Sequence, residues 1–208
     1  RGSRDKRAMG KATKYGRKEQ ETAWKNTEVD ALYTLSDAGV NVPRPHGFFH
    51  GVLLMELVVD EAGYSAPRLA EVELSAEQAR RFHVELMADV VRMLCCDLIH
   101  GDLSEYNVLV TEQGPVIIDF PQVVSASGNN SARTMLLRDV HNIRDCLARF
   151  APELKNTHFG EEMWALYEKG ELQNDSQLTG QFKFASHKAD VNSVMMSIED
   201  ARQEAIIR

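Results

Sequence analysis

One stretch near the middle of the chain, residues 98–110 with the sequence LIHGDLSEYNVLV, restricts the fold more than any other. It places Asp102 and Asn107 between two apolar flanks that are suited to burial. After the turn sequence TEQGP comes a second apolar segment, VIIDF over residues 116–120, and the pair predicts a β-hairpin. Because a hairpin brings its two ends together, we expect Asp102, Asn107 and Asp119 to converge at its open end.

These three polar side chains have the chemistry of a magnesium site. A carboxylate and an amide oxygen suit Mg²⁺, a hard cation that prefers oxygen ligands and retains several waters and phosphates. Asp119 follows three apolar residues, which is an unusual setting for an ordinary surface carboxylate. We therefore expect Asn107 and Asp119 to hold the metal and Asp102 to remain free to orient a nucleophile.

Periodicity predicts an α+β fold that is mainly helical beyond residue 59. Ser75 and Gln78 have the spacing of a helix capping box, and the apolar stripe that follows predicts a long helix to about Cys96. The other expected elements are a helix from Lys18 to Ala38 that Gly39 stops, a strand pair within residues 47–59 that turns at His50-Gly51, and helices over residues 134–150, 160–170 and 187–207.

Composition sets the broad class of protein. With 208 residues and 43% hydrophobic content, the chain can bury the core of one domain or two small lobes. No apolar run approaches the roughly 18 residues that a membrane span needs, so we expect no membrane partner and a cytoplasmic location. The three cysteines lack the paired spacing of a zinc site or a disulfide framework, and Cys95 and Cys96 are expected to be small core hydrophobes.

The charge is unevenly distributed. Residues 1–18 hold eight Lys and Arg against the single acidic residue Asp5, although the whole chain has a net charge of −7. Because this block has few large apolar residues, we expect a basic mobile loop. Two interpretations remain open, a solvated loop and an arm that binds RNA or another polyanion.

The segment HGDLSEYN followed by IIDFPQ resembles the catalytic and metal-binding loops of the RIO family of atypical serine/threonine protein kinases. The resemblance covers about residues 1–150, where TAWKNTEVDALYTLSDAGVNVPRP is similar to the family's regulatory helix, LLMEL to its hinge and LLRDVHNIRDCLARF to the helix behind the catalytic loop. It implies a RIO-type protein-kinase-like fold of the bacterial RIO-like kind. The implied parts are a loop over residues 1–18, a partial N-lobe over residues 19–58 and a helical C-lobe over residues 59–208.

The resemblance also implies roles for individual residues. Asp102 would accept the proton of the attacking group, and Asn107 and Asp119 would hold Mg²⁺, or Mn²⁺ in its place, on the phosphates of ATP. In some family members the residue that matches Asp119 is itself phosphorylated. The implied activity is γ-phosphate transfer to a protein substrate or to the kinase itself, together with ATP hydrolysis.

At the other end of the nucleotide, the resemblance makes the backbone of Glu56 and Val58 the adenine contacts, with Met55 lining the pocket. Glu28 would be the glutamate of the regulatory helix. The Gly-rich loop and the strand-borne Lys of a kinase are not found in this sequence, so the chain is interpreted as beginning inside a longer kinase. We therefore expect the 208-residue chain alone to bind ATP weakly and to transfer phosphate poorly.

Two alternative functions remain open. One is a small-molecule phosphotransferase of the aminoglycoside or choline type. Those families more often have Leu-His-x-x-Asn after the catalytic Asp and Glu or Trp near the second Asp, so Ser104-Glu105-Tyr106 and Pro121-Gln122 argue against it. The other is a non-catalytic, ATP-dependent assembly factor. Archaeal and eukaryotic family members act in ribosome maturation, and the basic segment is compatible with a ribosomal or RNA partner. His100 and Asp139 are interpreted as structural residues that bond the loop backbone, Asp139 from the start of a helix.

Overall fold

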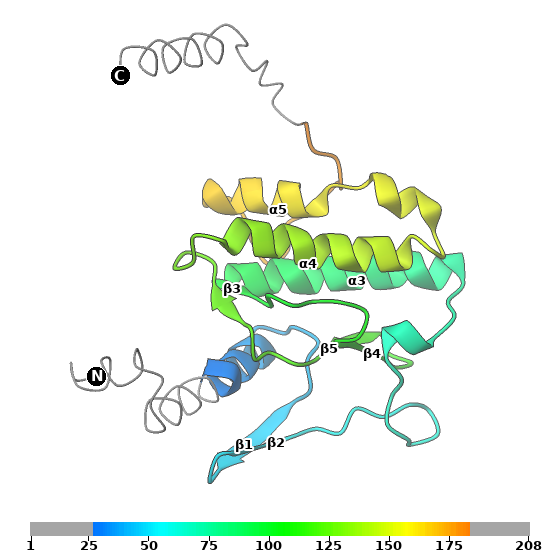
Figure 1. Cartoon of the computed structure of the whole chain (residues 1–208), viewed down its shortest axis with the longest axis vertical. Coiled ribbons are helices and arrows are strands. Elements are labelled where there is room, and N and C mark those ends of the chain that lie inside the picture. Colours follow the sequence, from blue (N-terminus) through cyan, green and yellow to red (C-terminus); the bar gives the residue numbers. More distant parts are fainter. Residues whose placement is uncertain (1–26, 184–208) are drawn as a thin grey trace, which may run out of the picture.

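A computed structural model describes residues 27–183 of the chain. It combines a layer of helices with three short two-stranded sheets, so the α+β prediction is confirmed. The helices stack on one side, and most of the strand-containing part lies beneath them (Figure 1). The predicted basic loop and the predicted helix over residues 187–207 lie outside the described residues.

Three helices form the stacked layer: α3 (Ala76–Cys95), α4 (Ala132–Leu147) and α5 (Phe159–Glu168). All three were predicted, with bounds that differ by one to three residues. The capping box is confirmed, because the Gln78 N–H donates to Ser75 Oγ at 3.1 Å and the Ser75 N–H donates to Gln78 Oε1 at 2.9 Å. These bonds satisfy two N–H groups that the helix itself leaves unpaired.

The main core lies between this helical layer and the strands below it. Its fully buried large side chains lie between residues 35 and 147: Leu35, Leu69, Phe82, Leu86, Met93, Leu94, Ile99, Leu103, Ile117, Leu136, Ile143 and Leu147. Leu103 and Ile117 lie within residues 98–119, next to the polar side chains of that stretch, so burial of these two side chains helps to fix the loops on which the polar residues lie.

The strands follow the predicted order. β1 (Pro45–Phe49) and β2 (Val52–Met55) are antiparallel and turn at His50 and Gly51, whose φ values of 52° and 83° match a type I′ turn. The pair is shorter than predicted, because residues 56–59 leave it. The chain there folds against residues 64–66 instead, with the Ala66 N–H donating to the Val58 carbonyl at 3.0 Å.

The second hairpin consists of β4 (Val108–Val110) and β5 (Pro115–Ile117), as predicted. A third pair, β3 (Leu98–Ile99) with β6 (Val124–Ser125), was not predicted. The short 3-10 helices η1 (Leu69–Glu71) and η2 (Pro152–Asn156) complete the described elements.

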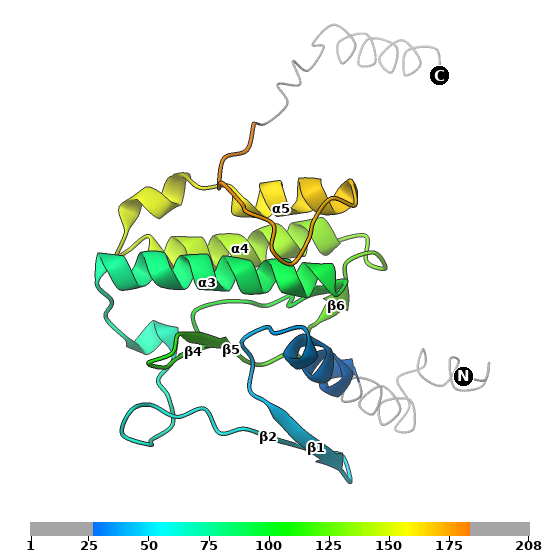
Figure 2. The same cartoon turned by 180° about the vertical axis from the view of Figure 1, so that it is seen from behind.

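The helix over residues 27–37 lies at the edge of the strand-containing part (Figure 2). As predicted, Gly39 follows its end, with a φ of 75° that favours glycine. Asn41 then joins this segment to the second hairpin, since its carbonyl accepts the Ile117 N–H at 2.8 Å and its side chain donates to the Pro115 carbonyl at 2.5 Å.

The cysteine prediction was wrong in one respect. Cys95 is exposed and Cys96 is only half-buried, because α3 ends at Cys95, just after the buried pair Met93 and Leu94. Cys146 is buried, and all three thiols are free. No helix within residues 27–183 has the length and apolar character that a membrane span requires.

Candidate active site

The loop over residues 100–107, here called the HGD loop, is held by Asp139 of α4. This carboxylate is 1% exposed; its Oδ2 accepts the Gly101 N–H at 2.8 Å and its Oδ1 accepts the Leu103 N–H at 3.2 Å. Asn142, one turn along, donates to the Leu103 carbonyl at 3.0 Å. The predicted structural role of Asp139 is confirmed, although the residue lies in the middle of α4 and does not start it.

Only glycine fits without strain at position 101 of this loop. Its φ is 82°, and an added Cβ would lie 2.5 Å from the Gln122 carbonyl oxygen and 2.8 Å from Met135 Cε. We expect Gly101→Ala to lower the free energy of unfolding by about 3 kcal/mol, which urea titration measures. Gly39→Ala is the matched control. Gly39 has a φ of 75° and open space around it, so Gly39→Ala should lower the free energy of unfolding only by the conformational strain of about 1 kcal/mol. Equal costs for the two variants would contradict the close approach.

The buried Asp139 carboxyl predicts a pH dependence of stability. Burial raises its pKa to about 6, against the lowering effect of the Gly101 and Leu103 N–H groups. Between about pH 4 and pH 6 the folded state therefore holds a proton that the unfolded state has lost. Stability should fall as pH rises through this window, by up to about 1.4 kcal/mol per pH unit for this group.

Urea titrations from pH 4 to pH 7 would measure this slope. Asp139→Asn should be less stable at every pH, because the amide cannot accept both N–H groups, and its slope should be smaller. The change of stability with pH that remains in Asp139→Asn should come from Asp89, because burial raises the pKa of Asp89 to about 6 as well. An unchanged slope in Asp139→Asn would contradict the assignment.

His100 supports the same loop from its apolar side. It is buried, its ring lies 5.0 Å from the Phe120 ring, and its Nε2 lies 3.0 Å from the Ile118 carbonyl oxygen. Burial lowers the pKa of this imidazole, which favours the neutral form. A neutral ring with its hydrogen on Nε2 donates to Ile118 and accepts the Asp102 N–H at Nδ1, 3.3 Å away. The predicted packing role is confirmed.

The Asp102 side chain lies on the outer side of the HGD loop. It is exposed, and its Oδ2 accepts a long hydrogen bond of 3.4 Å from Gln122 Nε2. Its backbone carbonyl accepts the side-chain amide of Asn107 at 2.9 Å. Since the Asn107 nitrogen is used in this bond, its Oδ1 is left as the free acceptor of that side chain.

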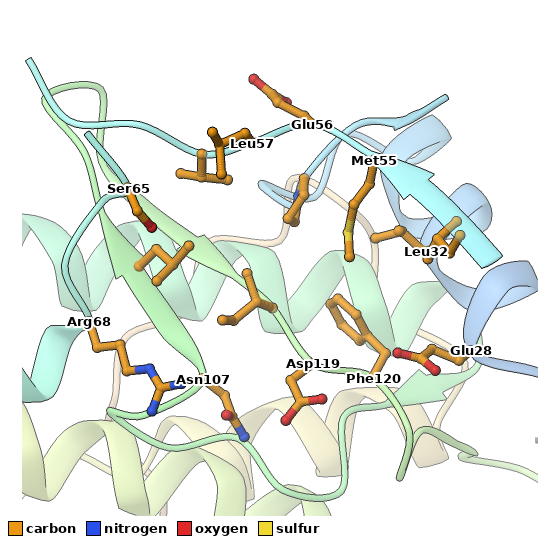
Figure 3. Close-up of a pocket in the computed structure, with 15 residues that line it drawn as sticks. Glu28, Leu32, Met55, Glu56, Leu57, Ser65, Arg68, Asn107, Asp119 and Phe120 are labelled. Carbon is orange, nitrogen blue, oxygen red and sulfur yellow. The ribbon is translucent and has the colours of Figure 1, made fainter. Parts of the chain in front are cut away.

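Asp119 lies two residues after the end of β5 and has a φ of 71°, which is uncommon for a residue other than glycine. The Ile118 N–H donates to the Asn107 carbonyl at 3.0 Å, so the ends of the two hairpin strands are tied together just before Asp119. Figure 3 shows the Asn107 and Asp119 side chains next to each other and pointing the same way. The predicted convergence of these two residues is therefore seen in the structure.

These side chains border a cavity of about 360 Å³ between the β2 end and the second hairpin. This volume lies in the range of small-molecule sites. The cavity is lined by Glu28, Leu32, Pro43, Leu53, Met55, Glu56, Leu57, Val58, Ser65, Arg68, Asn107, Leu109, Ile118, Asp119 and Phe120. Six of the seven predicted site residues are among them, and Asp102 is the exception.

Sequence reasoning did not select the other lining residues. Most are apolar side chains such as Leu53 and Leu109, whose spacing is equally typical of an ordinary core. Ser65 and Arg68 lie in a segment without regular strands, so no periodicity marks them. An isolated polar residue in such a segment gives no signal of its own.

The backbone at the cavity's upper edge has free hydrogen-bonding groups. The Glu56 N–H donates to the Arg44 carbonyl, and the Val58 carbonyl accepts the Ala66 N–H. The Glu56 carbonyl and the Val58 N–H take part in no backbone hydrogen bond among residues 27–183. In Figure 3 the Met55 side chain points into the cavity and the Glu56 side chain points away from it. This edge therefore offers one acceptor and one donor.

The cavity is a favourable place for a cation. Burial raises the pKa of the half-buried Glu28 carboxyl, and the negative charge of Asp119 raises it further. No hydrogen bond or ion pair of this carboxylate occurs within the described part of the chain. No three His, Cys, Asp or Glu side chains in that part form a metal cluster of their own. The donor pair of Asn107 and Asp119 instead fits Mg²⁺, which keeps waters and phosphate oxygens as further ligands.

Comparison with known proteins decides the family. The family model of the RIO domain matches residues 1–159. The chain belongs to the RIO family. The kinase-like RIO fold predicted from the sequence is thereby confirmed. The division of the chain at residues 18 and 58 stays a prediction.

Three relatives of the RIO domain illustrate the similarity. The chain is 34% identical to the serine/threonine-protein kinase RIO1 of Chaetomium thermophilum over 61% of this chain and 26% of that protein. It is 37% identical to the RIO-type serine/threonine-protein kinase Rio1 of Haloferax volcanii over 61% of this chain and 42% of that one. The corresponding protein of Thermoplasma acidophilum is 32% identical over 58% of this chain and 61% of its own length.

The chain thus matches less than two thirds of each of these relatives. They come from a eukaryote and two archaea, so the bacterial type of the RIO domain stays a prediction.

Proposed function

We propose that this RIO domain binds Mg·ATP in the cavity and transfers the γ-phosphate to a serine or threonine hydroxyl of a protein, including its own chain. The observation that carries the proposal is the pairing of Asn107 and Asp119 at the end of one hairpin, with the Asn107 side-chain amide donating to the Asp102 carbonyl. The names of the relatives, all serine/threonine-protein kinases, support the reaction class.

The nucleotide would lie with its adenine at the upper edge of the cavity. The adenine edge has an amino donor beside a ring-nitrogen acceptor, and the Glu56 carbonyl and Val58 N–H offer the complementary pair. Met55 would pack against the base. This assignment places the phosphates at Asn107 and Asp119, which lie toward the other side of the cavity in Figure 3.

A magnesium ion, or Mn²⁺ in its place, would neutralise the charge that develops on the phosphates, and the Asn107 Oδ1 and the Asp119 carboxylate would hold it. Glu28 would bind a cation on the nucleotide side of the helix over residues 27–37. The Asp102 carboxylate, exposed beside the cavity, would orient the substrate hydroxyl and accept its proton. The new bond joins this hydroxyl oxygen to the γ-phosphorus while the bond to the ADP oxygen breaks.

Other parts of the function rest on the sequence alone. The protein substrate, a ribosomal or RNA partner for residues 1–18 and a cytoplasmic location are proposals. Phosphorylation of Asp119 itself is a further one. If it occurs, it would consume a metal ligand, so the phosphorylated chain should bind Mg·ATP less tightly.

Phosphate transfer from labelled Mg·ATP tests the proposal. The assay offers the 208-residue chain itself, a general protein substrate, and a panel of aminoglycosides, choline and sugars. Where the gene encodes residues before Arg1, the longer protein is assayed in parallel. We expect label on protein serine or threonine and none on the soluble alcohols. Robust turnover of a soluble alcohol would favour the small-molecule alternative and contradict the proposal.

A further inference from the structure

The charged side chains that line the cavity are strongly unequal in sign. The Glu28 and Asp119 carboxylates are acidic, whereas the Glu56 side chain points away from the cavity and its carboxylate accepts the Arg44 N–H. Arg68 is the one basic residue among the lining residues within the described part of the chain. A triphosphate carries several negative charges, so it would be repelled by the Glu28 and Asp119 carboxylates unless cations offset them. The metal is one such cation. Arg68 is the candidate for a second.

The backbone of Arg68 is fixed to the structures that carry the site. Arg68 pairs with Leu109 of β4, and its N–H donates to Glu71 Oε2 at 3.0 Å. On one side, the Pro67 carbonyl accepts the Val110 N–H at 2.8 Å. On the other side, the Ala70 N–H donates to the Glu105 carbonyl of the HGD loop at 3.1 Å. The position of Arg68 is therefore set by the same hairpin and loop that set Asn107.

The Arg68 side chain extends from this anchor toward Asn107. Figure 3 shows its guanidinium beside Asn107, on the side away from Glu28. The residue is exposed, and its guanidinium forms no ion pair with any described residue. Other arginines are paired: Arg80 with Glu153 at 2.5 Å and Arg92 with Asp89 at 2.7 Å. Arg68 thus presents five unpaired N–H donors at the edge of the cavity.

We propose that Arg68 binds the phosphate groups of the nucleotide from the side of Asn107 opposite Glu28. This inference rests on the proposed function and adds a binding residue to it. A planar guanidinium matches the geometry of phosphate oxygens and can donate two parallel hydrogen bonds. Arg68 and the metal would then hold the phosphates from two directions. The affinity of the chain for these ligands should therefore rise with the number of phosphates, from adenosine to ADP to ATP.

Binding of Mg·ATP, Mg·ADP and adenosine to Arg68→Gln tests this, measured by ligand-observed NMR titration into the millimolar range. A charge-assisted hydrogen bond contributes about 1.5–3 kcal/mol, so the Kd for ATP should rise about tenfold or more. The Kd for adenosine should change less than about twofold. The Kd of Arg68→Lys for ATP should lie between those of the wild type and Arg68→Gln, because lysine keeps the positive charge but lacks the planar guanidinium. Arg81→Gln is the control, since Arg81 is an exposed arginine that does not line this cavity.

Each other outcome has a definite meaning. An unchanged ratio of ATP to adenosine affinity in Arg68→Gln would overturn the inference and leave the proposed function standing. Equal losses for both ligands, with a lower Tm, would show a structural role and overturn it too. Unchanged ATP binding with slower transfer to an acidic peptide would assign Arg68 to the protein substrate. If the wild-type chain binds none of the three ligands, the proposed function itself fails.

Discussion

Replacing Asp119 with asparagine should abolish the magnesium dependence of ATP binding and lower phosphate transfer at least about 100-fold. The substitution removes the one carboxylate of the proposed metal pair, and a metal ion supplies several kcal/mol of stabilisation to the charge of the transition state. Asparagine is nearly the same shape and tolerates the left-handed backbone that Asp119 adopts, with a φ of 71°. The fold should therefore remain intact, and Tm should stay close to the wild-type value.

The experiment compares the Kd for ATP at several magnesium concentrations in the wild type and in Asp119→Asn. A second readout is the Glu28 carboxyl, whose pKa the Asp119 charge helps to raise. In the variant this pKa should fall, and NMR titration would detect it even without nucleotide. Asp145→Asn, an exposed carboxylate that pairs with Arg144 at 2.9 Å, is the control. Magnesium-dependent binding that persists in Asp119→Asn would contradict the metal assignment.

The parts of the fold that sequence predicts well are those with a local cause. The Ser75–Gln78 capping box needs two side chains three residues apart, and the helix that it starts needs only a periodic apolar face. The second hairpin likewise depends on two short apolar runs and a turn. The polar pair Asn107 and Asp119 could be predicted for the same reason, because the hairpin alone brings them together.

The parts that sequence could not predict depend on contacts between distant segments. β3 and β6 are two residues long each, and their pairing is reinforced by Asp97, which accepts the Ser125 hydroxyl at 2.6 Å and the Tyr167 hydroxyl at 2.7 Å. Neither partner can be inferred from the residues around Asp97. The exposure of Cys95 also depends on where the end of α3 lies relative to the rest of the molecule.

The candidate site shows the same contrast between what local sequence predicts and what depends on distant segments. The selected residues that match a family motif line the cavity, except Asp102, whereas Arg68 was missed because it follows no motif or period in the sequence. Its contribution becomes visible only when the charges around the cavity are compared. Glu28 and Asp119, whose carboxylates belong to the cavity, were selected for other roles, so nothing in the sequence suggested a search for a balancing cation.

Replacing Asp102 with asparagine should separate chemistry from binding. We expect phosphate transfer to fall by about 10²–10⁴-fold, the usual contribution of a general base, while the Kd for Mg·ATP changes less than about twofold. The reason for the separation is geometric, because Asp102 does not line the cavity and is exposed. An asparagine oxygen can still accept the hydrogen bond from Gln122, so the loop should keep its shape.

Glu105→Gln is the matched control, because Glu105 lies on the same HGD loop and its removal should leave transfer unchanged. If Asp102→Asn loses ATP affinity as steeply as transfer, Asp102 acts on the nucleotide or its metal and not on the substrate hydroxyl. The same variant distinguishes the kinase from the assembly-factor alternative in cells. A catalytic role requires that cellular function is lost with transfer. Function that persists without transfer would mean that ATP binding, through residues such as Asn107 and Asp119, is what the cell uses.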